Sequence, residues 1–240
     1  MCGIIAYSGN KFLRGDLDKA LHLMNHRGPD NQSSTVLNND IFLGHNRLSI
    51  IDLDSRSNQP FTSGNHVMVF NGEVYNYLEL IKDHNLNVRT KSDTEVVLEM
   101  FKKYGEKCLG FFNGMFALVI YDTQSKEIFV ARDRLGVKPL YFSRDSSGIL
   151  FASEIASIQS LVQSEFDDFG MRQYRKLRMT VKGDTIYSKI KSFPPGHYLM
   201  NGKFQKYWDL DYGEKKAPSD EQLDQLIRDS VELRNRSDVR

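Results

Sequence analysis

A cysteine stands second in this chain, directly after the initiator methionine and before the run "GIIAY". Its small side chain permits removal of Met1, which would expose the α-amino group of Cys2 beside its own thiol. Because an α-amino group has a pKa of about 8, it can act as a general base for the sulfur, directly or through a water. Cys2 can therefore supply a nucleophile and its base together, or it can be a small buried residue that begins a strand.

The pair Asn71–Gly72 follows the apolar run "VMVF" and precedes a helical pattern. Asn-Gly is the dipeptide most typical of a hairpin, so a simple turn is one interpretation. In the other, the Asn71 carboxamide and the Gly72 N–H point together at an oxyanion that develops during a reaction, where one such donor contributes about 3 kcal/mol. The pair by itself does not decide between a turn and an oxyanion hole.

Two charged residues could hold the two ends of an amino acid. Arg47, in "LGHNRLSIID", follows a strand-like run, and its planar guanidinium suits a carboxylate, although a solvated arginine needs no ligand. Asp93, in "KSDTEVVLEM", falls in the first turn of a helix that Ser92 and Glu95 would open with a capping box. The helix dipole stabilises an acid there, and the same acid could bind an ammonium group. With Cys2 and the Asn-Gly pair, these are the parts that an amidase for an α-amino acid amide needs.

Both strands and helices must position these residues. Short runs rich in β-branched and aromatic residues predict strands at residues 3–8, 33–37, 41–45, 66–70, 114–122, 127–132, 139–142 and 148–153. Apolar residues at helical spacing predict helices at residues 17–24, 74–81, 94–104 and 220–233. Because the strands cluster between the helical segments instead of alternating strictly with them, we expect an α+β fold with antiparallel sheets.

Composition and charge argue against several classes of protein. The 240 residues carry 32 basic and 31 acidic side chains, and a net charge of +1 gives no broad field for nucleic acid or anionic lipid. The longest apolar run, residues 115–121, is far shorter than the ~20 residues of a membrane helix. No secretory signal opens the chain, so we expect a cytoplasmic protein. Cys2 and Cys108 predict no disulfide framework, and the six histidines show no metal-ligand spacing.

The end of the chain differs from its middle. The polar stretch "GEKKAPSDEQ" is typical of a linker, and Ser219 with Gln222 predicts a capping box at the start of a helix. Leu223, Leu226, Ile227 and Val231 would then share one helical face. We expect a domain over residues 1–210, followed at 211–240 by a linker and the first helix of a further, C-terminal part of the natural chain. A terminal helix that docks back on its own domain is the alternative.

Ten segments in this order resemble the class II glutamine amidotransferase domain of asparagine synthetase. They are "MCGI", "HRGPD", "GHNRLSIIDL", "NQPF", "VFNGEVYNY", "SDTEVVL", "GMFALVIYD", "RDRLGVKPLYF", "FASEI" and "PPGHYL", and they span most of residues 1–200. The resemblance implies an N-terminal nucleophile fold, a four-layer αββα sandwich of two antiparallel sheets. "HRGPD" and "RDRLGVKPLYF" are interpreted as scaffold and domain-interface segments, and Cys108 matches no catalytic position.

The resemblance also implies a role for each matched position. After loss of Met1, Cys2 would attack the side-chain carboxamide of glutamine, and Asn71 and Gly72 would form the oxyanion hole. Asp93 would hold the α-ammonium with backbone help near Glu73. Arg47 would bind the substrate α-carboxylate with help from the backbone groups of Leu48, Ile50 and Ile51. No metal or cofactor is implied for this part of the chain.

The implied reaction releases ammonia and leaves a glutamyl thioester, which water hydrolyses to glutamate. In the family the ammonia travels to a C-terminal synthetase domain, where ATP and magnesium activate a carboxylate, aspartate in asparagine synthetases. That domain could lie in the same chain or in a partner subunit, and a homodimer is possible. The family's Ser-Gly-Gly pyrophosphate loop would follow "SVELRNRSDV", beyond Arg240, so the visible chain predicts glutaminase activity alone.

Three alternatives stay open at this point. Other class II amidotransferases share "CGI" and the Asn-Gly pair but serve sugar phosphates or phosphoribosyl acceptors, and "HRGPD" followed by "GHNRLSIIDL" favours the asparagine synthetase group over them. Within that group the acceptor could instead be a carboxylate other than aspartate, on a sugar, a peptide or an antibiotic precursor. The chain could also be a non-catalytic scaffold of the same fold.

Overall fold

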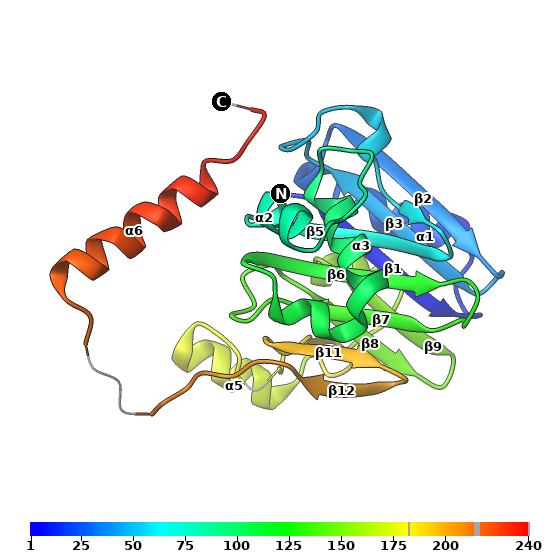
Figure 1. Ribbon diagram of the computed structural model, residues 1–240. Helices are drawn as coiled ribbons and strands as arrows, with labels where there is room; N and C mark the ends of the chain where they lie inside the picture. Colours follow the sequence, from blue (N-terminus) through cyan, green and yellow to red (C-terminus); the bar gives the residue numbers. More distant parts are fainter. Residues whose placement is uncertain (182, 214–216, 240) are drawn as a thin grey trace.

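The computed structural model describes residues 1–181, 183–213 and 217–239, and its described strands form two six-stranded antiparallel sheets (Figure 1). Sheet A has the order β10 (Lys191–Ser192), β8 (Tyr141–Asp145), β9 (Gly148–Ala152), β1 (Gly3–Gly9), β3 (Ile41–Arg47) and β2 (Asn31–Leu37). Sheet B has the order β12 (Lys203–Lys206), β11 (His197–Met200), β7 (Ile128–Arg132), β6 (Gly114–Asp122), β5 (His66–Val74) and β4 (Phe61–Ser63).

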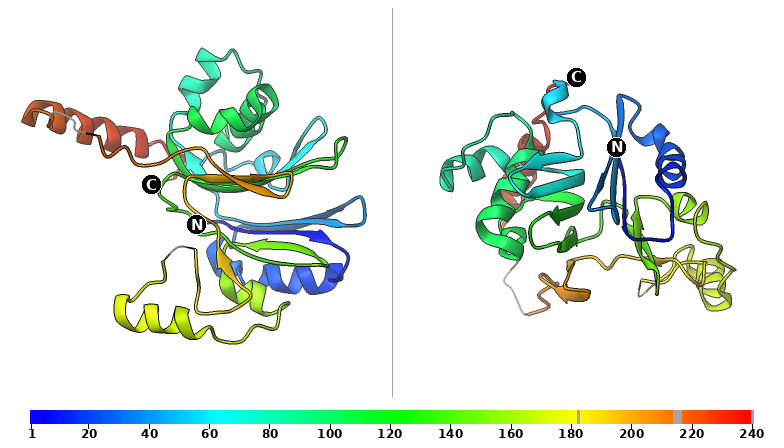
Figure 2. Two further views of the ribbon diagram at one scale, coloured as in Figure 1. Left: turned by 90° about the horizontal axis from the view of Figure 1, so that it is seen from below. Right: turned by 90° about the vertical axis from the view of Figure 1, so that its right-hand side faces the viewer.

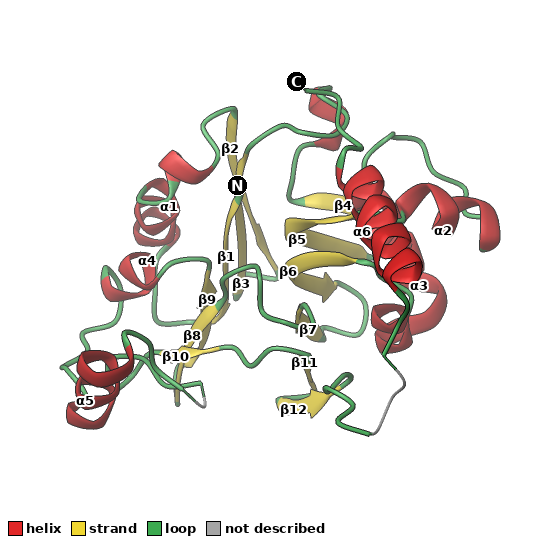
Figure 3. Cartoon of the chain, turned by 90° about the vertical axis from the view of Figure 1, so that its left-hand side faces the viewer, coloured by secondary structure: helices red, strands yellow, loops and turns green. Residues whose placement is uncertain are grey.

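Helices cover the outer faces of both sheets, as two views at right angles show (Figures 2 and 3). On the side of sheet A lie α1 (Arg14–His22), α4 (Ile155–Gln159) and α5 (Asp168–Leu177), and on the side of sheet B lie α2 (Tyr77–Asp83) and α3 (Asp93–Tyr104). Within the described residues, three short 3-10 helices lie in the connections, at Asn25–Arg27, Ser55–Ser57 and Gly105–Gly110. The order helix, sheet, sheet, helix confirms the predicted four-layer α+β sandwich.

Alternation along the strands determines which side chains enter the space between the sheets. Ile4 and Ala6 of β1, Ile41 and Leu43 of β3, and Val67 and Val69 of β5 belong to one buried cluster between the two sheets. Their neighbours point outward, toward the helices. Because side chains of alternate residues share a face, positions 2, 47 and 71 continue the three inward rows. The fold therefore directs three of the predicted site residues toward the same end of the space between the sheets.

The eight predicted strands are all present, and the predicted helices form with shifted ends. The largest difference lies at Asn71–Gly72, where β5 continues to Val74, so the turn interpretation is wrong. Pairing of Gly72 with Phe116 on β6 outweighs the local hairpin preference of Asn-Gly. The helix expected at residues 74–81 consequently begins only at Tyr77. Sequence patterns did not predict the ten-residue helix α5, nor α4, β4 and β10 to β12, each of which has five residues or fewer.

The capping predictions had different outcomes at the two helices. At α6 (Asp220–Arg234) both hydrogen bonds of the Ser219–Gln222 capping box form, as predicted. At α3, Ser92 caps the helix by accepting a hydrogen bond from Thr94 N. Glu95 does not complete a capping box there, because its carboxylate accepts hydrogen bonds from the backbone N–H groups of Arg89 and Thr90 instead.

The chain after residue 210 leaves the sandwich and comes back to it. The predicted linker falls partly on residues 214–216, which lie outside the described residues. The apolar face of α6 stays exposed, with Leu226 61% and Val231 54% accessible. After α6 the chain contacts the body of the domain, where Arg236 pairs with Glu79 at 2.6 Å and Asp238 N donates to Ile50 O at 2.9 Å. Among the described helices, none is long and apolar enough to cross a membrane.

Candidate active site

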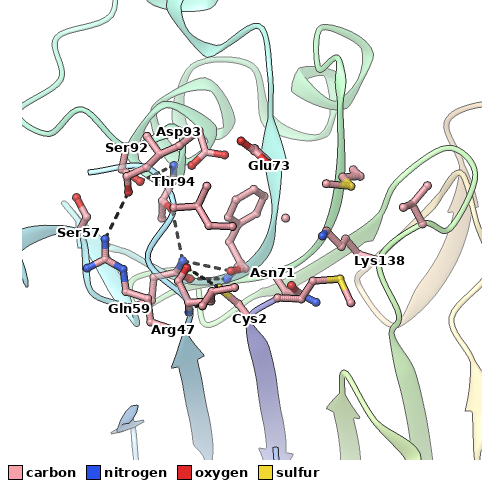
Figure 4. Close-up of a pocket in the computed structure, with 18 residues that line it drawn as sticks. Cys2, Arg47, Ser57, Gln59, Asn71, Glu73, Ser92, Asp93, Thr94 and Lys138 are labelled. Atoms are coloured by element: carbon pink, nitrogen blue, oxygen red, sulfur yellow. Dashed lines mark hydrogen bonds between the residues drawn. The ribbon is translucent and has the colours of Figure 1, made fainter. Parts of the chain in front are cut away.

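One pocket at the end of the space between the sheets gathers every site residue predicted from the sequence (Figure 4). These residues come from the start of β1, the end of β3 and the loop after it, the end of β5, and the first turn of α3. They are Cys2, Arg47, Leu48, Ile50, Ile51, Asn71, Gly72, Glu73 and Asp93. The fold thus brings together all nine, and the role of each stays a prediction.

The thiol of Cys2 is held against the loop that follows β3. Leu48 N donates to Cys2 Sγ at 3.4 Å, and Sγ donates to Leu48 O at 3.6 Å. Arg27 Nε donates to the Cys2 carbonyl at 2.9 Å and fixes the backbone from the other side. Burial raises the pKa of the Cys2 thiol, although the Leu48 backbone contact opposes the rise. A thiol in this environment needs a nearby base to react at neutral pH.

Met1 is attached to Cys2 in this structure and is 56% exposed at the pocket. The Cys2 nitrogen is therefore part of a peptide bond here. Removal of Met1 would turn that nitrogen into a free α-amine on the same residue as the thiol, at the same pocket. The nucleophile and the base would then belong to one residue.

The Asn71 side chain is 1% exposed and lies beside Cys2 in Figure 4. Neither its amide nitrogen nor its amide oxygen has a hydrogen-bond partner among the described residues. A buried carboxamide without partners is costly, because it has lost its water and gained nothing in return. A ligand in the pocket can supply the missing partner.

The N–H of Gly72 faces the same pocket, because alternate N–H groups of a strand point to the same side. Phe70 N donates to Gln59 Oε1 at 2.6 Å, and Val74 N donates to Asp93 Oδ2 at 2.9 Å, both at the edge of β5 away from β6. Gly72 lies between them at that edge. It also tolerates no side chain, since a Cβ would lie 2.4 Å from the carbonyl oxygen of Met115.

The guanidinium of Arg47 is buried and oriented by the loop that follows β3. Its Nη1 donates to Asp54 O at 2.9 Å and to Asn58 Oδ1 at 2.7 Å. Its Nη2 donates to Asp52 O and, at 3.5 Å, to Ile51 O. Three of these bonds have ordinary or short lengths and the fourth is at the limit, so the fourth is the easiest for an incoming carboxylate to displace.

Two carboxyl groups stand at the other end of the site. Asp93 begins α3 and is 5% exposed, and burial together with the charge of Glu73 raises its pKa to about 7. Burial also raises the pKa of Glu73, while Lys138 opposes that rise. A cation placed between the two carboxyl groups would relieve both effects. This end of the pocket is therefore suited to an ammonium group.

Other residues that the sequence did not predict as site residues also line the pocket, namely Ser57, Gln59, Phe70, Ser92, Thr94, Met115, Val137 and Lys138. Gln59 extends the edge of β5, because its amide nitrogen donates to Phe70 O at 3.2 Å and its amide oxygen accepts from Phe70 N. The segments "HRGPD" and "RDRLGVKPLYF", interpreted as scaffold, supply Arg27 to the Cys2 backbone and Lys138 to the pocket itself. Only their density of charged residues could have drawn attention to them.

No group of three or more His, Cys, Asp or Glu side chains suited to a metal ion occurs among the residues that the structure describes. The ionisable and amide groups of the pocket are a thiol, two carboxamides, a guanidinium, an ammonium and two carboxyl groups.

Comparison with known proteins gives a consistent family. The family model of the glutamine amidotransferase domain matches residues 1–208. Asparagine synthetase (glutamine-hydrolysing) 3 of Bacillus subtilis is 30% identical, with 100% of this chain and 42% of that protein covered. Amidase chry2 of Gibberella zeae is 34% identical, with 100% of this chain and 40% of that protein covered. This chain thus spans less than half the length of these two relatives.

A solved structure supports the same fold. The glutamine phosphoribosylpyrophosphate amidotransferase of Bacillus subtilis superimposes with a TM-score of 0.64 at 19% identity, over 86% of this chain and 49% of that one. At this identity the likeness concerns the fold alone. The match of the family model over residues 1–208 shows that this chain belongs to the glutamine amidotransferase family.

Proposed function

We propose that this chain hydrolyses glutamine to glutamate and ammonia through a thioester on Cys2. One observation carries the proposal. Cys2 lies in a single pocket with a buried carboxamide that lacks partners among the described residues, an oriented guanidinium, the buried carboxyl of Asp93 and the half-buried carboxyl of Glu73. These groups match, in number and charge, the reacting amide, the α-carboxylate and the α-ammonium of glutamine.

The first half of the reaction forms the thioester. The Cys2 α-amine accepts the thiol proton while Sγ attacks the side-chain carbonyl carbon of glutamine. Asn71 Nδ2–H and Gly72 N–H donate to the resulting oxyanion. When the C–N bond of the glutamine side chain breaks, the α-ammonium group of Cys2 returns the proton to the departing nitrogen, which leaves as ammonia.

The second half releases glutamate. The α-amine takes a proton from a water that attacks the thioester carbonyl, and the same two donors hold the second oxyanion. The C–S bond then breaks, and the sulfur recovers a proton. Throughout, Arg47 and the Asp93–Glu73 pair hold the two charged ends of the substrate.

We further propose that the ammonia serves a synthetase domain, which lies elsewhere in the natural protein or in a partner subunit. The partner subunit could be a second copy of the same protein in a homodimer. The name of the Bacillus subtilis relative supports a synthetase domain, as does the fact that it is more than twice as long as this chain. There ATP and magnesium would activate a carboxylate, with aspartate as the proposed acceptor and the cytosol as the proposed compartment. The amidase-named relative supports the second candidate, an acceptor other than aspartate.

The deciding experiment measures glutamate release from glutamine by the processed chain and by its Cys2→Ala variant. Intact-mass analysis first establishes that Met1 has been removed. We expect turnover only with Cys2 present, and Cys108→Ala serves as the matched control because Cys108 is buried away from the pocket. Equal release by wild type and Cys2→Ala would contradict the proposal and favour a scaffold. Full activity in a chain that retains Met1 would remove the α-amine from the mechanism.

A further inference from the structure

Lys138 is a buried cation that the proposed reaction does not use. Its side chain lines the pocket on the side opposite Arg47, with Cys2 and Asn71 between the two (Figure 4). The residue is 5% exposed, and no hydrogen bond or ion pair joins its Nζ to any residue within 1–181, 183–213 or 217–239. The Nζ atom is not among the fully buried side-chain atoms without a partner, so the ammonium group of this otherwise buried residue reaches the open space of the pocket. A cation held in a largely buried position without a protein partner is costly, so this position needs an explanation.

The loop after β7 holds Lys138 in this orientation by hydrogen bonds to its backbone. Asp133 Oδ2 accepts from Lys138 N at 3.0 Å and from Phe116 N on β6 at 3.1 Å. Arg132 Nε donates to Lys138 O at 2.7 Å, and its Nη2 donates to Gly136 O at 2.8 Å. This network uses Arg132 and Asp133 of "RDRLGVKPLYF" and fixes the backbone from which the Lys138 side chain enters the pocket.

The charged groups that act on Lys138 come from several elements. Burial lowers the pKa of its ammonium, while Cys2, Glu73 and Asp133 raise it and Arg27 lowers it further. In turn, the charges of the chain's amino terminus and of Lys138 lower the pKa of the Cys2 thiol, and the charge of Asp93 raises it. The thiol and Lys138 therefore act on each other in the same pocket.

The amino terminus belongs to the same group. Burial lowers the pKa of the Met1 amine, Arg27 and Lys138 lower it further, and Cys2 and Asp30 oppose the change. After removal of Met1, the amine would move one residue closer to the thiol and stay beside Arg27, which contacts the Cys2 carbonyl at 2.9 Å. The charge of Lys138 thus acts on both the Cys2 thiol and the amine, the two groups that must exchange a proton.

We propose that Lys138 is an electrostatic positioning residue for the glutaminase reaction: its positive charge favours the Cys2 thiolate over the thiol and keeps the adjacent α-amine neutral. It transfers no proton itself. A cation attracts the thiolate and repels a second cation, and both effects are strong in a buried site. The inference rests on the proposed glutaminase function, because it assigns the lysine to that same nucleophile and base.

The test compares Lys138→Met with wild type in the processed full chain. Alkylation of Cys2 by iodoacetamide is followed by mass spectrometry across pH, since only the thiolate reacts. Loss of the lysine should shift the alkylation profile upward by about one pH unit, so that the rate near neutrality falls roughly tenfold and the two rates converge at high pH. The acidic limb of kcat/KM should move in the same direction, and Lys138→Arg should restore both profiles.

Lys176→Met is the matched control, because it removes the same charge from an exposed position of α5. A Lys138→Met variant that folds and alkylates with an unshifted pH profile would overturn the inference, and so would a uniform loss of rate at all pH values. Neither result touches the proposed function, which fails only if Cys2→Ala releases as much glutamate as wild type. A shift in alkylation without any glutaminase activity in wild type would retain the effect on the thiol but remove its catalytic purpose.

Discussion

The carboxyl group of Asp93 should lower the stability of the fold at neutral pH, and Asp93→Asn should reveal the cost. The carboxyl is buried in the first turn of α3, and Asp93 Oδ2 accepts from Val74 N at 2.9 Å. An asparagine oxygen can accept the same hydrogen bond without carrying a charge. The substitution therefore removes the charge and keeps the shape and the contact.

The magnitude follows from the pKa of Asp93, which burial raises from 3.8 to about 7. Because the folded protein binds this proton more tightly than the unfolded chain, the free energy of unfolding falls as pH rises from about 4 to about 7. Above that range the ionised, buried carboxylate costs about 4 kcal/mol, and near pH 4.5 the cost is about 1 kcal/mol. Asp93→Asn should be more stable than its parent by these amounts.

The measurement is urea unfolding of Cys2→Ala and Cys2→Ala/Asp93→Asn across this pH range, so that added glutamine is not consumed. Saturating glutamine should stabilise the parent at high pH, because its ammonium favours the ionised carboxylate, and should stabilise the Asp93→Asn variant much less. Asp122→Asn is a control for which the stability change should have the opposite sign. Burial would raise the pKa of Asp122, but hydrogen bonds from Gln124 and Ser125 lower it below its usual value. A stability difference at Asp93 that does not change with pH would refute the reasoning.

Three further substitutions test the geometry of the pocket. Asn71→Ala should lower kcat about 10²- to 10³-fold in the glutamate-release assay and leave urea stability unchanged or higher, because the buried carboxamide has no partner among the described residues; unchanged kcat would remove it from the oxyanion hole. Gly72→Ala should cost about 3 kcal/mol in urea unfolding, because its Cβ would lie 2.4 Å from Met115 O; an unshifted midpoint would contradict that close approach. Asp238→Ala removes the 2.8 Å hydrogen bond that Asp52 N donates to Asp238, and so loosens the loop that orients Arg47. The KM for glutamine should therefore rise severalfold with little change in kcat, and an unchanged KM would show that the loop needs no such support.

The sequence predicted the residues of the pocket better than the backbone around them. Cys2, Arg47 and Asp93 could be identified because their chemistry depends on residue type and on their place relative to local elements. At Asn71–Gly72 the local signal indicated a turn, and the strand forms because β6 pairs with residues 66–74 through sequence-distant contacts. Propensity describes a dipeptide alone, so it could not weigh this pairing.

Other features left no local signal at all. Lys138 lines the pocket from a loop whose backbone Asp133 and Arg132 hold in place, and nothing in "GVKPL" separates this lysine from the many exposed lysines of the chain. Likewise, Ser92 and Glu95 satisfied the capping-box pattern, yet Glu95 forms its hydrogen bonds with Thr90 and Arg89. Patterns of residue types cannot choose among competing partners that only the folded chain brings within reach.

Burial of polar groups does not by itself mark the site, and His45 shows why. It lies in the same inward row of β3 as Arg47 and is 0% exposed, and neither ring nitrogen forms a hydrogen bond of ordinary geometry among the described residues, although a backbone contact with Phe70 opposes the lowering of its pKa. Burial and the Arg47 charge lower its pKa to about 3, so the ring is neutral at physiological pH and imposes only the cost of a neutral group. Asn71 and Lys138 differ from His45 because they line the pocket, where a ligand can reach them. A buried polar group without a partner points to function when a substrate can complete it, and we propose that at this pocket the missing partners are an oxyanion and a thiolate, the two negative charges that amide hydrolysis would create.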